Sequence, residues 1–288
     1  MSLERIADSS PATEEDTVWK EETGWLDRVP RAAKMLFVFA VFILLWDLVT
    51  RFGMVSRIIL PTPYETLKDL IFVGKNLLTG QYMLGALWIT LKEVFYGFLL
   101  AMLIGFTLGV IVGETAFGEQ AIMPYLVAID TMPKVAFAPL FVAWLGFDID
   151  SKVALAAFIA TFPIVVGTAA GLHSADVNSR NLFRTMGASR WQTLIKMKLP
   201  MALPQVFTGL KIGSVGVMAG AITGEFLGGG KGFGELIRTA ASQLNTPRVF
   251  SLILYLSIIG LAIFTLVSFA QRRIVFWQKD RVSTGGEG

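Results

Sequence analysis

The sequence predicts an all-α membrane protein with six transmembrane helices. This prediction rests on the composition of the chain and on the length of its apolar segments. Of the 288 residues, 54% are hydrophobic and 16% are charged, whereas soluble domains carry about 25% charged residues. Mean hydropathy is +0.62. The apolar residues gather in six segments near the length of about 20 residues that a bilayer core requires. This composition excludes disordered, fibrous and disulfide-rich classes and argues against a soluble enzyme.

Three of these segments contain no charged residue. They are Val94–Gly113, Val153–Leu172 and Val249–Ala270. Backbone N–H and C=O groups in lipid must find their hydrogen-bond partners within the segment, so each is predicted to be a helix.

The other three segments, Met35–Thr50, Ala121–Phe147 and Ala202–Gly224, carry a charge, a proline or both. Each is also predicted to cross the membrane, because six such segments in one chain cannot all be buried as soluble core helices. Pro133 and Pro139 are expected to bend or break the helix of the second segment.

Two short amphipathic helices are expected between spans. One covers Tyr64–Leu78 after an extended Pro61–Pro63 segment, with Thr62 or Thr66 at its start. The other covers Glu235–Leu244 and follows a glycine-rich turn. Within the second and fifth spans, glycine recurs at every fourth position, a spacing that lets helices approach closely.

The distribution of Lys and Arg favours cytoplasmic termini. With both termini inside, the cytoplasmic segments hold 15 of these residues and the opposite side holds 9. Residues 1–33 are then a cytoplasmic tail without the apolar core of a signal peptide. Residues 34–275 form the six-helix domain, and 276–288 form a second cytoplasmic tail.

The loop over residues 173–200 has a helix–glycine–helix pattern. Ser174 or Asp176 can cap the first helix, Gly187 can end it, and Ser189 can cap the second. The loop is basic and amphipathic. Periodicity alone leaves two roles open, which are contact with anionic lipid and contact with a partner protein.

The loop also resembles a signature of ABC importer permeases. Gly187 is followed by nine residues and then by Met197-x-Leu199-Pro200, as in the pattern Glu-Ala-Ala-x3-Gly-x9-Ile-x-Leu-Pro. The segments 132–140 and 60–63 are similar to the nitrate, sulfonate, taurine and bicarbonate type of these permeases. One departure is clear, because Asn181-Leu182-Phe183 stands where the family has Glu-Ala-Ala.

The resemblance implies the type I permease fold of a binding-protein-dependent inner-membrane transport component. It implies a multi-pass protein of the bacterial cell (inner) membrane, a homodimer, two ATPase subunits that bind ATP and Mg, and a soluble binding protein. The cargo implied is a small anion, with a heteroaromatic vitamin or pyrimidine precursor as the alternative. The loop would be a coupling helix that contacts the ATPase through Asn181, Leu182, Phe183, Arg184, Gly187, Ala188, Ser189, Leu199 and Pro200.

The chain itself is not expected to be an enzyme. The glycine run 228–232 lacks the first glycine and the Ser/Thr of a phosphate-binding loop. There is no cysteine and a single histidine, His173, so no metal site is expected. Nothing indicates nucleic-acid binding. A membrane-embedded enzyme and an autonomous channel or secondary carrier are the competing classes, and both predict function without an ATPase.

Charged residues within spans are candidates for the translocation pathway. Asp130 and Lys134 are four residues apart and can pair. Alternatively, Lys134 borders the pathway and favours anions. Glu225 lies near the outer end of the fifth span, where it can belong to a gate or form a hydrogen bond with the glycine turn.

Overall fold

The computed structural model describes residues 29–277, which form helices and no strand. Five helices are long and apolar enough to cross a membrane, and a sharply bent pair of helices makes a sixth span. The predicted fold class is thus confirmed. The two predicted tails fall almost entirely outside the described residues.

The unbroken spans agree with the predicted segments, but they are longer. They are α1 (Arg31–Arg51), α3 (Tyr82–Glu114), α6 (Ile149–His173), α9 (Leu199–Gly228) and α11 (Thr246–Ile274). The largest difference is in α3, which begins at Tyr82 rather than at Val94. This extension places Lys92 and Glu93 inside a helix.

The third span is broken, as its prolines predict. It consists of a π-helical turn η2 (Gly118–Ile122), α4 (Met123–Thr131), a 3-10 turn η3 (Lys134–Phe137) and α5 (Ala138–Leu145). The two arms meet at 89°. The α4 helix ends at Thr131, because Met132 precedes Pro133 and has an extended backbone conformation.

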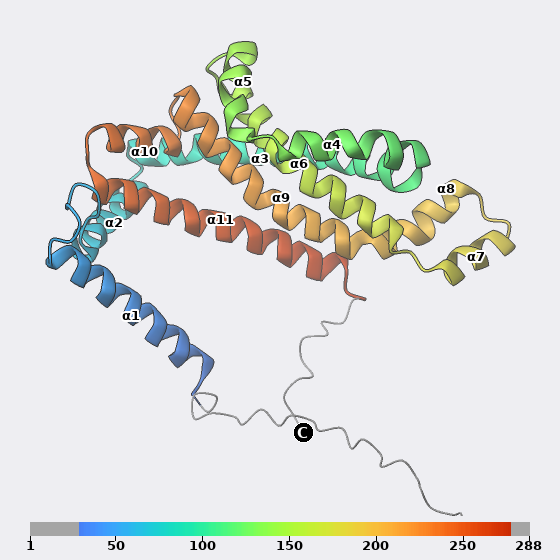
Figure 1. Cartoon of the computed structure of the whole chain (residues 1–288), viewed down its shortest axis with the longest axis horizontal. Coiled ribbons are helices and arrows are strands. Elements are labelled where there is room, and N and C mark those ends of the chain that lie inside the picture. The colour runs from blue at the N-terminus through green and yellow to red at the C-terminus, as the bar shows by residue number, and fades with distance from the viewer. Residues whose placement is uncertain (1–28, 278–288) are drawn as a thin grey trace, which may run out of the picture.

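Two short helices, α2 (Pro63–Leu78) and α10 (Phe233–Ser242), lie together at one end of the bundle (Figure 1). Thr62 starts α2 with a capping box: its hydroxyl accepts a hydrogen bond from the Glu65 N–H at 3.2 Å, and the Glu65 carboxylate accepts one from the Thr62 N–H. Arg248 at the start of α11 pairs with Asp69 of α2 at 2.8 Å.

The helices α7 (Val177–Thr185) and α8 (Arg190–Thr193) lie at the opposite end and form what we call the α7–α8 hairpin (Figure 1). A second π-helical turn, η4 (Leu194–Lys198), continues α8 into α9 without a break. The predicted helix–glycine–helix pattern is therefore present, and its second helix is the first part of the fifth span.

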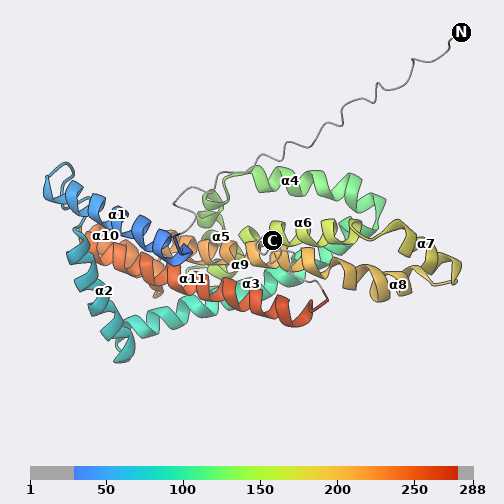
Figure 2. The same ribbon diagram turned by 90° about the horizontal axis from the view of Figure 1, so that it is seen from below.

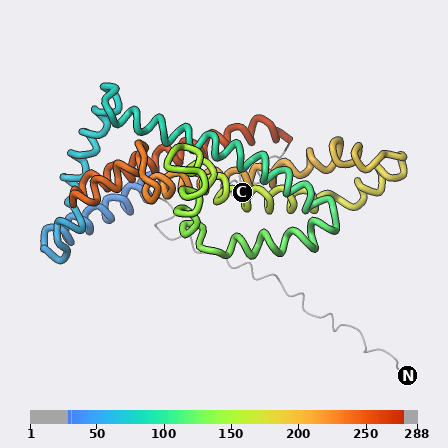
Figure 3. Tube along the Cα trace, turned by 90° about the horizontal axis from the view of Figure 1, so that it is seen from above, coloured from blue at the N-terminus to red at the C-terminus, as the bar shows by residue number. Residues whose placement is uncertain are grey.

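The helix α6 is the centre of the core and packs against both α3 and α9 (Figures 2 and 3). Glycines permit this packing, as their spacing predicts. A Cβ added at Gly105 of α3 would lie 2.8 Å from the Cβ of Ile164, and one added at Gly209 of α9 would lie 2.6 Å from the Pro163 carbonyl oxygen. By contrast, α1 is mostly exposed and is linked to the bundle through Trp46, whose indole N–H donates to the Pro61 carbonyl at 2.9 Å.

The substitution Gly220→Ala is expected to destabilise the bundle. Its Cβ would lie 2.6 Å from the Cα of Ala156, and a backbone atom cannot rotate out of the way. Overpacking of this kind costs about 1–3 kcal/mol, which will lower the midpoint of thermal unfolding in detergent. Gly85→Ala in α3 is the matched control, because a Cβ there meets open space. Equal midpoints for the two variants would contradict this account of the packing.

Candidate functional site

The first turn of the α7–α8 hairpin is fixed by Asp176. Its carboxylate accepts hydrogen bonds from the Ser179 N–H at 2.9 Å and from the Ser179 hydroxyl at 3.1 Å. These bonds, above all the one from the backbone, hold the pKa of Asp176 below its usual value. The cap therefore stays ionised at neutral pH, where its charge also favours the positive end of the helix dipole.

The turn between the two helices follows the sequence prediction. Gly187 ends α7 with φ at +73°, a conformation that favours glycine. Ser189 then starts α8: its hydroxyl accepts from the Gln192 N–H at 3.2 Å, and the Gln192 side chain accepts from the Ser189 N–H at 2.8 Å. Local hydrogen bonds thus define both the start of α7 and the turn into α8.

The hairpin exposes large apolar side chains. Leu182 is 58% exposed, Met186 is 74% exposed and Trp191 is 68% exposed. The same segment carries the exposed basic residues Arg180, Arg184 and Arg190. Large apolar side chains that the fold leaves exposed are candidates for contact with a partner.

The predicted contact residues divide into two groups. Most lie on the exposed hairpin, with Phe183 and Ala188 half-buried. Leu199 and Pro200 instead lie half-buried at the start of α9, where Leu199 packs against the core. The structure thus places the first group on the hairpin and the second at its base.

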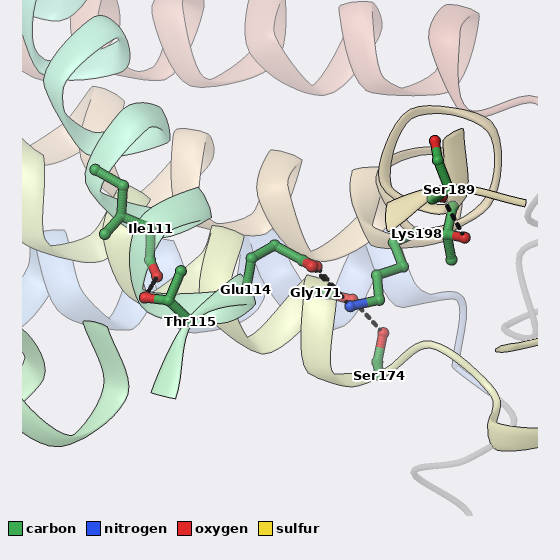
Figure 4. Close-up of polar contacts among 8 residues, drawn as sticks. Ile111, Glu114, Thr115, Gly171, Ser174, Ser189 and Lys198 are labelled. Carbon is green, nitrogen blue, oxygen red and sulfur yellow. Dashed lines mark hydrogen bonds and ion pairs between the residues drawn. The ribbon is translucent and has the colours of Figure 1, made fainter. Parts of the chain in front are cut away.

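An ion pair joins this base to α3. Lys198, the last residue of η4, donates to both carboxylate oxygens of Glu114 at 2.7 and 2.8 Å (Figure 4). The side chains are 14% and 21% exposed. Sequence reasoning did not find this pair, because its members are 84 residues apart. The only local signal is the position of Glu114, directly after an apolar span.

Asp130 and Lys134 form an ion pair across the break in the third span. They line a pocket of about 330 Å³ between α4 and the helices α3 and α6. Aromatic side chains dominate one wall: Phe141 and Phe158 have ring centroids 5.7 Å apart, and the Lys134 Nζ lies 5.9 Å from the ring of Phe162. The pair leaves the pocket with no net charge.

Glu225 does not line an open entrance to the translocation pathway, because it is only 1% exposed. Its carboxylate accepts hydrogen bonds from the Thr90 hydroxyl and from the Gly234 N–H, at 2.5 Å each. The carboxylate thus binds the first turn of α10, directly after the glycine turn named in the prediction, and a role in the pathway stays a prediction.

Two further buried charges surround Glu225, and sequence reasoning missed both. Glu93 and Lys152 are each 2% exposed. Glu93 shares a hydrogen bond with Glu225, and Lys152 acts on Glu225 through its positive charge. Lys152 donates to the carbonyl oxygens of Phe147 and Asp148, the latter at 3.0 Å. We call Thr90, Glu93, Lys152 and Glu225 the buried charge cluster.

Between residues 29 and 277, no group of three His, Cys, Asp or Glu side chains is placed to hold a metal ion. The described residues thus present an exposed apolar hairpin, an internal ion pair and a pocket.

Residues 97–276 match the family described as the inner membrane component of binding-protein-dependent transport systems. This range covers more than half of the chain. The chain belongs to this family. It is a permease subunit of an ABC importer and a multi-pass membrane protein.

The names of curated relatives of this permease mention different substrates. The formylaminopyrimidine transport permease protein ThiX of Halalkalibacterium halodurans is 31% identical over 89% of this chain and all of its own length. The putative aliphatic sulfonates transport permease protein SsuC of Bacillus subtilis is 30% identical over 97% of this chain and 99% of its own. The nitrate import permease protein NrtB of Leptolyngbya laminosa is 29% identical over 68% of this chain and 71% of its own.

Solved structures agree with the fold of the permease. The inward-facing MetNI methionine ABC transporter matches with a TM-score of 0.59 at 19% identity, over 69% of this chain and 97% of the other. At this identity the match supports the type I fold and says nothing of the substrate.

Proposed function

We propose that two copies of this permease form the membrane pathway of an ATP-driven importer, and that the α7–α8 hairpin is its coupling helix. The observation that carries the proposal is the capped hairpin that projects from the bundle with Leu182, Met186 and Trp191 exposed. An apolar surface that the fold shapes but does not cover requires a partner.

The partner is an ATPase subunit on each permease chain, which binds ATP and Mg²⁺. Asn181 replaces the carboxylate of the family signature, so Arg180, Arg184 and Arg190 dominate the charge of the hairpin. The ATPase groove should carry acidic side chains, because complementary charge sets the register of an interface. ATP drives the pathway only if it binds the closed arrangement of the ATPases more tightly than the open one.

The hairpin then lies in the cytoplasm with both termini, in agreement with the distribution of Lys and Arg. Residues 34–275 are the permease domain in the bacterial inner membrane. The end that carries α2 and α10 faces a soluble periplasmic or extracellular binding protein, which delivers the substrate.

For the substrate, the pocket geometry favours a planar heteroaromatic precursor. Asp130 neutralises Lys134, so the pocket lacks the net positive charge that selection of an anion would need. Phe141, Phe158 and Phe162 offer ring faces and edges to a planar ligand, and the relative ThiX is a formylaminopyrimidine permease. A small anion of the sulfonate, taurine, nitrate or bicarbonate class is the second candidate, supported by the sulfonate and nitrate relatives.

One uptake experiment tests both proposals. Vesicles that contain the permease, its ATPase and its binding protein are expected to take up a labelled formylaminopyrimidine only when ATP is supplied. Labelled taurine serves as the anion probe. Equal uptake by vesicles that lack the ATPase would overturn the importer and support a channel or carrier. Uptake of taurine alone would overturn the heteroaromatic substrate and leave the importer intact.

A further inference from the structure

The ends of α3, α6 and α9 pack closely against one another where the α7–α8 hairpin begins. A Cβ added at Gly113 of α3 would lie 3.0 Å from the Leu172 side chain of α6. One added at Gly171 of α6 would lie 2.7 Å from the Ala202 carbonyl oxygen of α9. Such close backbone contact leaves little room for these helices to move independently.

The Lys198–Glu114 pair adds a polar link at this point, across the side on which the hairpin enters the bundle (Figure 4). Two features separate it from an ordinary surface pair. Both side chains are largely buried, and both carboxylate oxygens accept from the ammonium group, so the bonds are charge-assisted and shielded from solvent. Glu114 is also the last residue of α3, where the helix dipole disfavours a carboxylate unless a cation compensates it.

A π-helical turn lies on each side of the pair. Lys198 ends η4, and η2 begins four residues after Glu114. Within helical segments, turns of this kind are rare and are often found at functional sites. Thr115 links η2 to α3 by two hydrogen bonds. Its hydroxyl accepts one from the Gly118 N–H at 2.9 Å and donates one to the Ile111 carbonyl oxygen at 2.7 Å.

The helix that follows η2 lies at the periphery of the bundle. No residue of α4 is buried, and Figure 3 shows it turning back from the end of α3 along the outside of the molecule. Its far end carries Asp130, which pairs with Lys134 at the break. A movement of the η2 turn would therefore carry α4 and the pocket wall with it.

We propose that Lys198 and Glu114 are positioning residues that transmit movement of the α7–α8 hairpin to the broken third span. The path runs from η4 through the ion pair to the end of α3, and from there through η2 to α4. This inference rests on the proposed function, because the ATPase supplies the movement.

The experiment uses two reporters in the assembled transporter. The sequence contains no cysteine, so Val177→Cys in the hairpin and Tyr125→Cys in α4 are unique sites for an environment-sensitive fluorophore. These residues are 63% and 73% exposed, and Val177 lies away from the apolar side chains proposed to contact the ATPase. Trapping with ATP, Mg²⁺ and vanadate is expected to change the signal at both sites in the otherwise unaltered protein.

In Lys198→Met and in Glu114→Gln, the Val177→Cys signal should persist, which shows that the ATPase is bound and closes. The Tyr125→Cys signal should fall about five-fold or more, the lower range of coupling between distinct sites. The exchange Lys198→Glu with Glu114→Lys should restore it. Lys196→Met and Glu119→Gln are the controls, because both residues are exposed and close to the pair; neither should change either signal.

A full Tyr125→Cys signal in Lys198→Met would overturn the inference and leave the proposed function intact. Failure of the charge exchange to restore the signal would also overturn it. If the single variants fail to assemble, recovery of assembly and of the α4 signal in the exchange supports the pair. No nucleotide-dependent change at Val177→Cys in the otherwise unaltered protein would overturn the proposed function and, with it, the inference.

Discussion

Replacing both Leu182 and Met186 by aspartate is expected to abolish the association of the permease with its ATPase subunits while the membrane helices stay folded. The two side chains are 58% and 74% exposed, so they contribute little to folding, and surface substitutions of this kind usually change stability by about 0.5 kcal/mol or less. In the interface, each would place a carboxylate where the ATPase receives an apolar group.

The effect on binding should be large, because apolar anchors at the centre of an interface contribute disproportionately. Loss of one such anchor costs at least about 2 kcal/mol, or roughly a thirty-fold loss of affinity. The measurement is the amount of ATPase that co-purifies with the permease from detergent, together with the thermal unfolding midpoint of the permease alone.

Val177→Asp is the matched control for this pair of substitutions. Val177 is 63% exposed and belongs to the same helix. At about 100° per residue, it lies about 140° around the helix axis from Leu182. This variant should retain the ATPase. If the double variant retained the ATPase at the normal ratio, the hairpin would not be part of the interface. Contact with anionic lipid would then be the remaining alternative.

The parts of this site that were predictable from sequence are those fixed by local interactions. Asp176, Gly187 and Ser189 cap or end a helix through groups only a few residues away, so their types and spacing are sufficient. The spans follow in the same way from apolar segments near the length of a bilayer core, of which three are uninterrupted. Even the pair Asp130–Lys134 forms at the predicted spacing, although the helix is broken between them.

The missed residues share a different property. Glu93, Glu114 and Lys152 each adjoin an apolar segment, and hydropathy alone makes such residues look like the borders of spans. In the structure, α3 and α6 extend past the apolar segments, which draws Glu93 and Lys152 into the interior. Their partners come from other helices, and no local pattern encodes which helix supplies them.

The buried charge cluster leads to the second prediction of large effect, which is that Lys152→Met will destabilise the permease severely. Lys152 is 2% exposed, and its ammonium group faces the carboxyl groups of Glu93 and Glu225. Methionine fills similar space without a charge. Removing one member of a buried charged set costs about 3–5 kcal/mol, because the remaining charges lose their compensation. We expect a sharp fall in the thermal unfolding midpoint and in the yield of folded protein.

The same geometry identifies the substitution that should rescue this variant. Glu225 has hydrogen bonds from Thr90 and Gly234, whereas the Oε2 atom of Glu93 is buried without a hydrogen-bond partner. Glu225 is therefore the carboxylate that Lys152 compensates, and Glu225→Gln removes this charge while keeping a side-chain oxygen that accepts hydrogen bonds. Combined with Lys152→Met, it should restore much of the lost stability.

Thermal unfolding of the two single variants and the double variant forms a complete cycle, in which the interaction energy between positions 152 and 225 is read directly. Lys231→Met controls for the loss of a lysine, because Lys231 is exposed in the neighbouring glycine turn. A double variant no more stable than Lys152→Met would show that the two groups do not compensate each other. The burial of Lys152 would then have to be explained by its hydrogen bonds to the carbonyl groups of Phe147 and Asp148 alone.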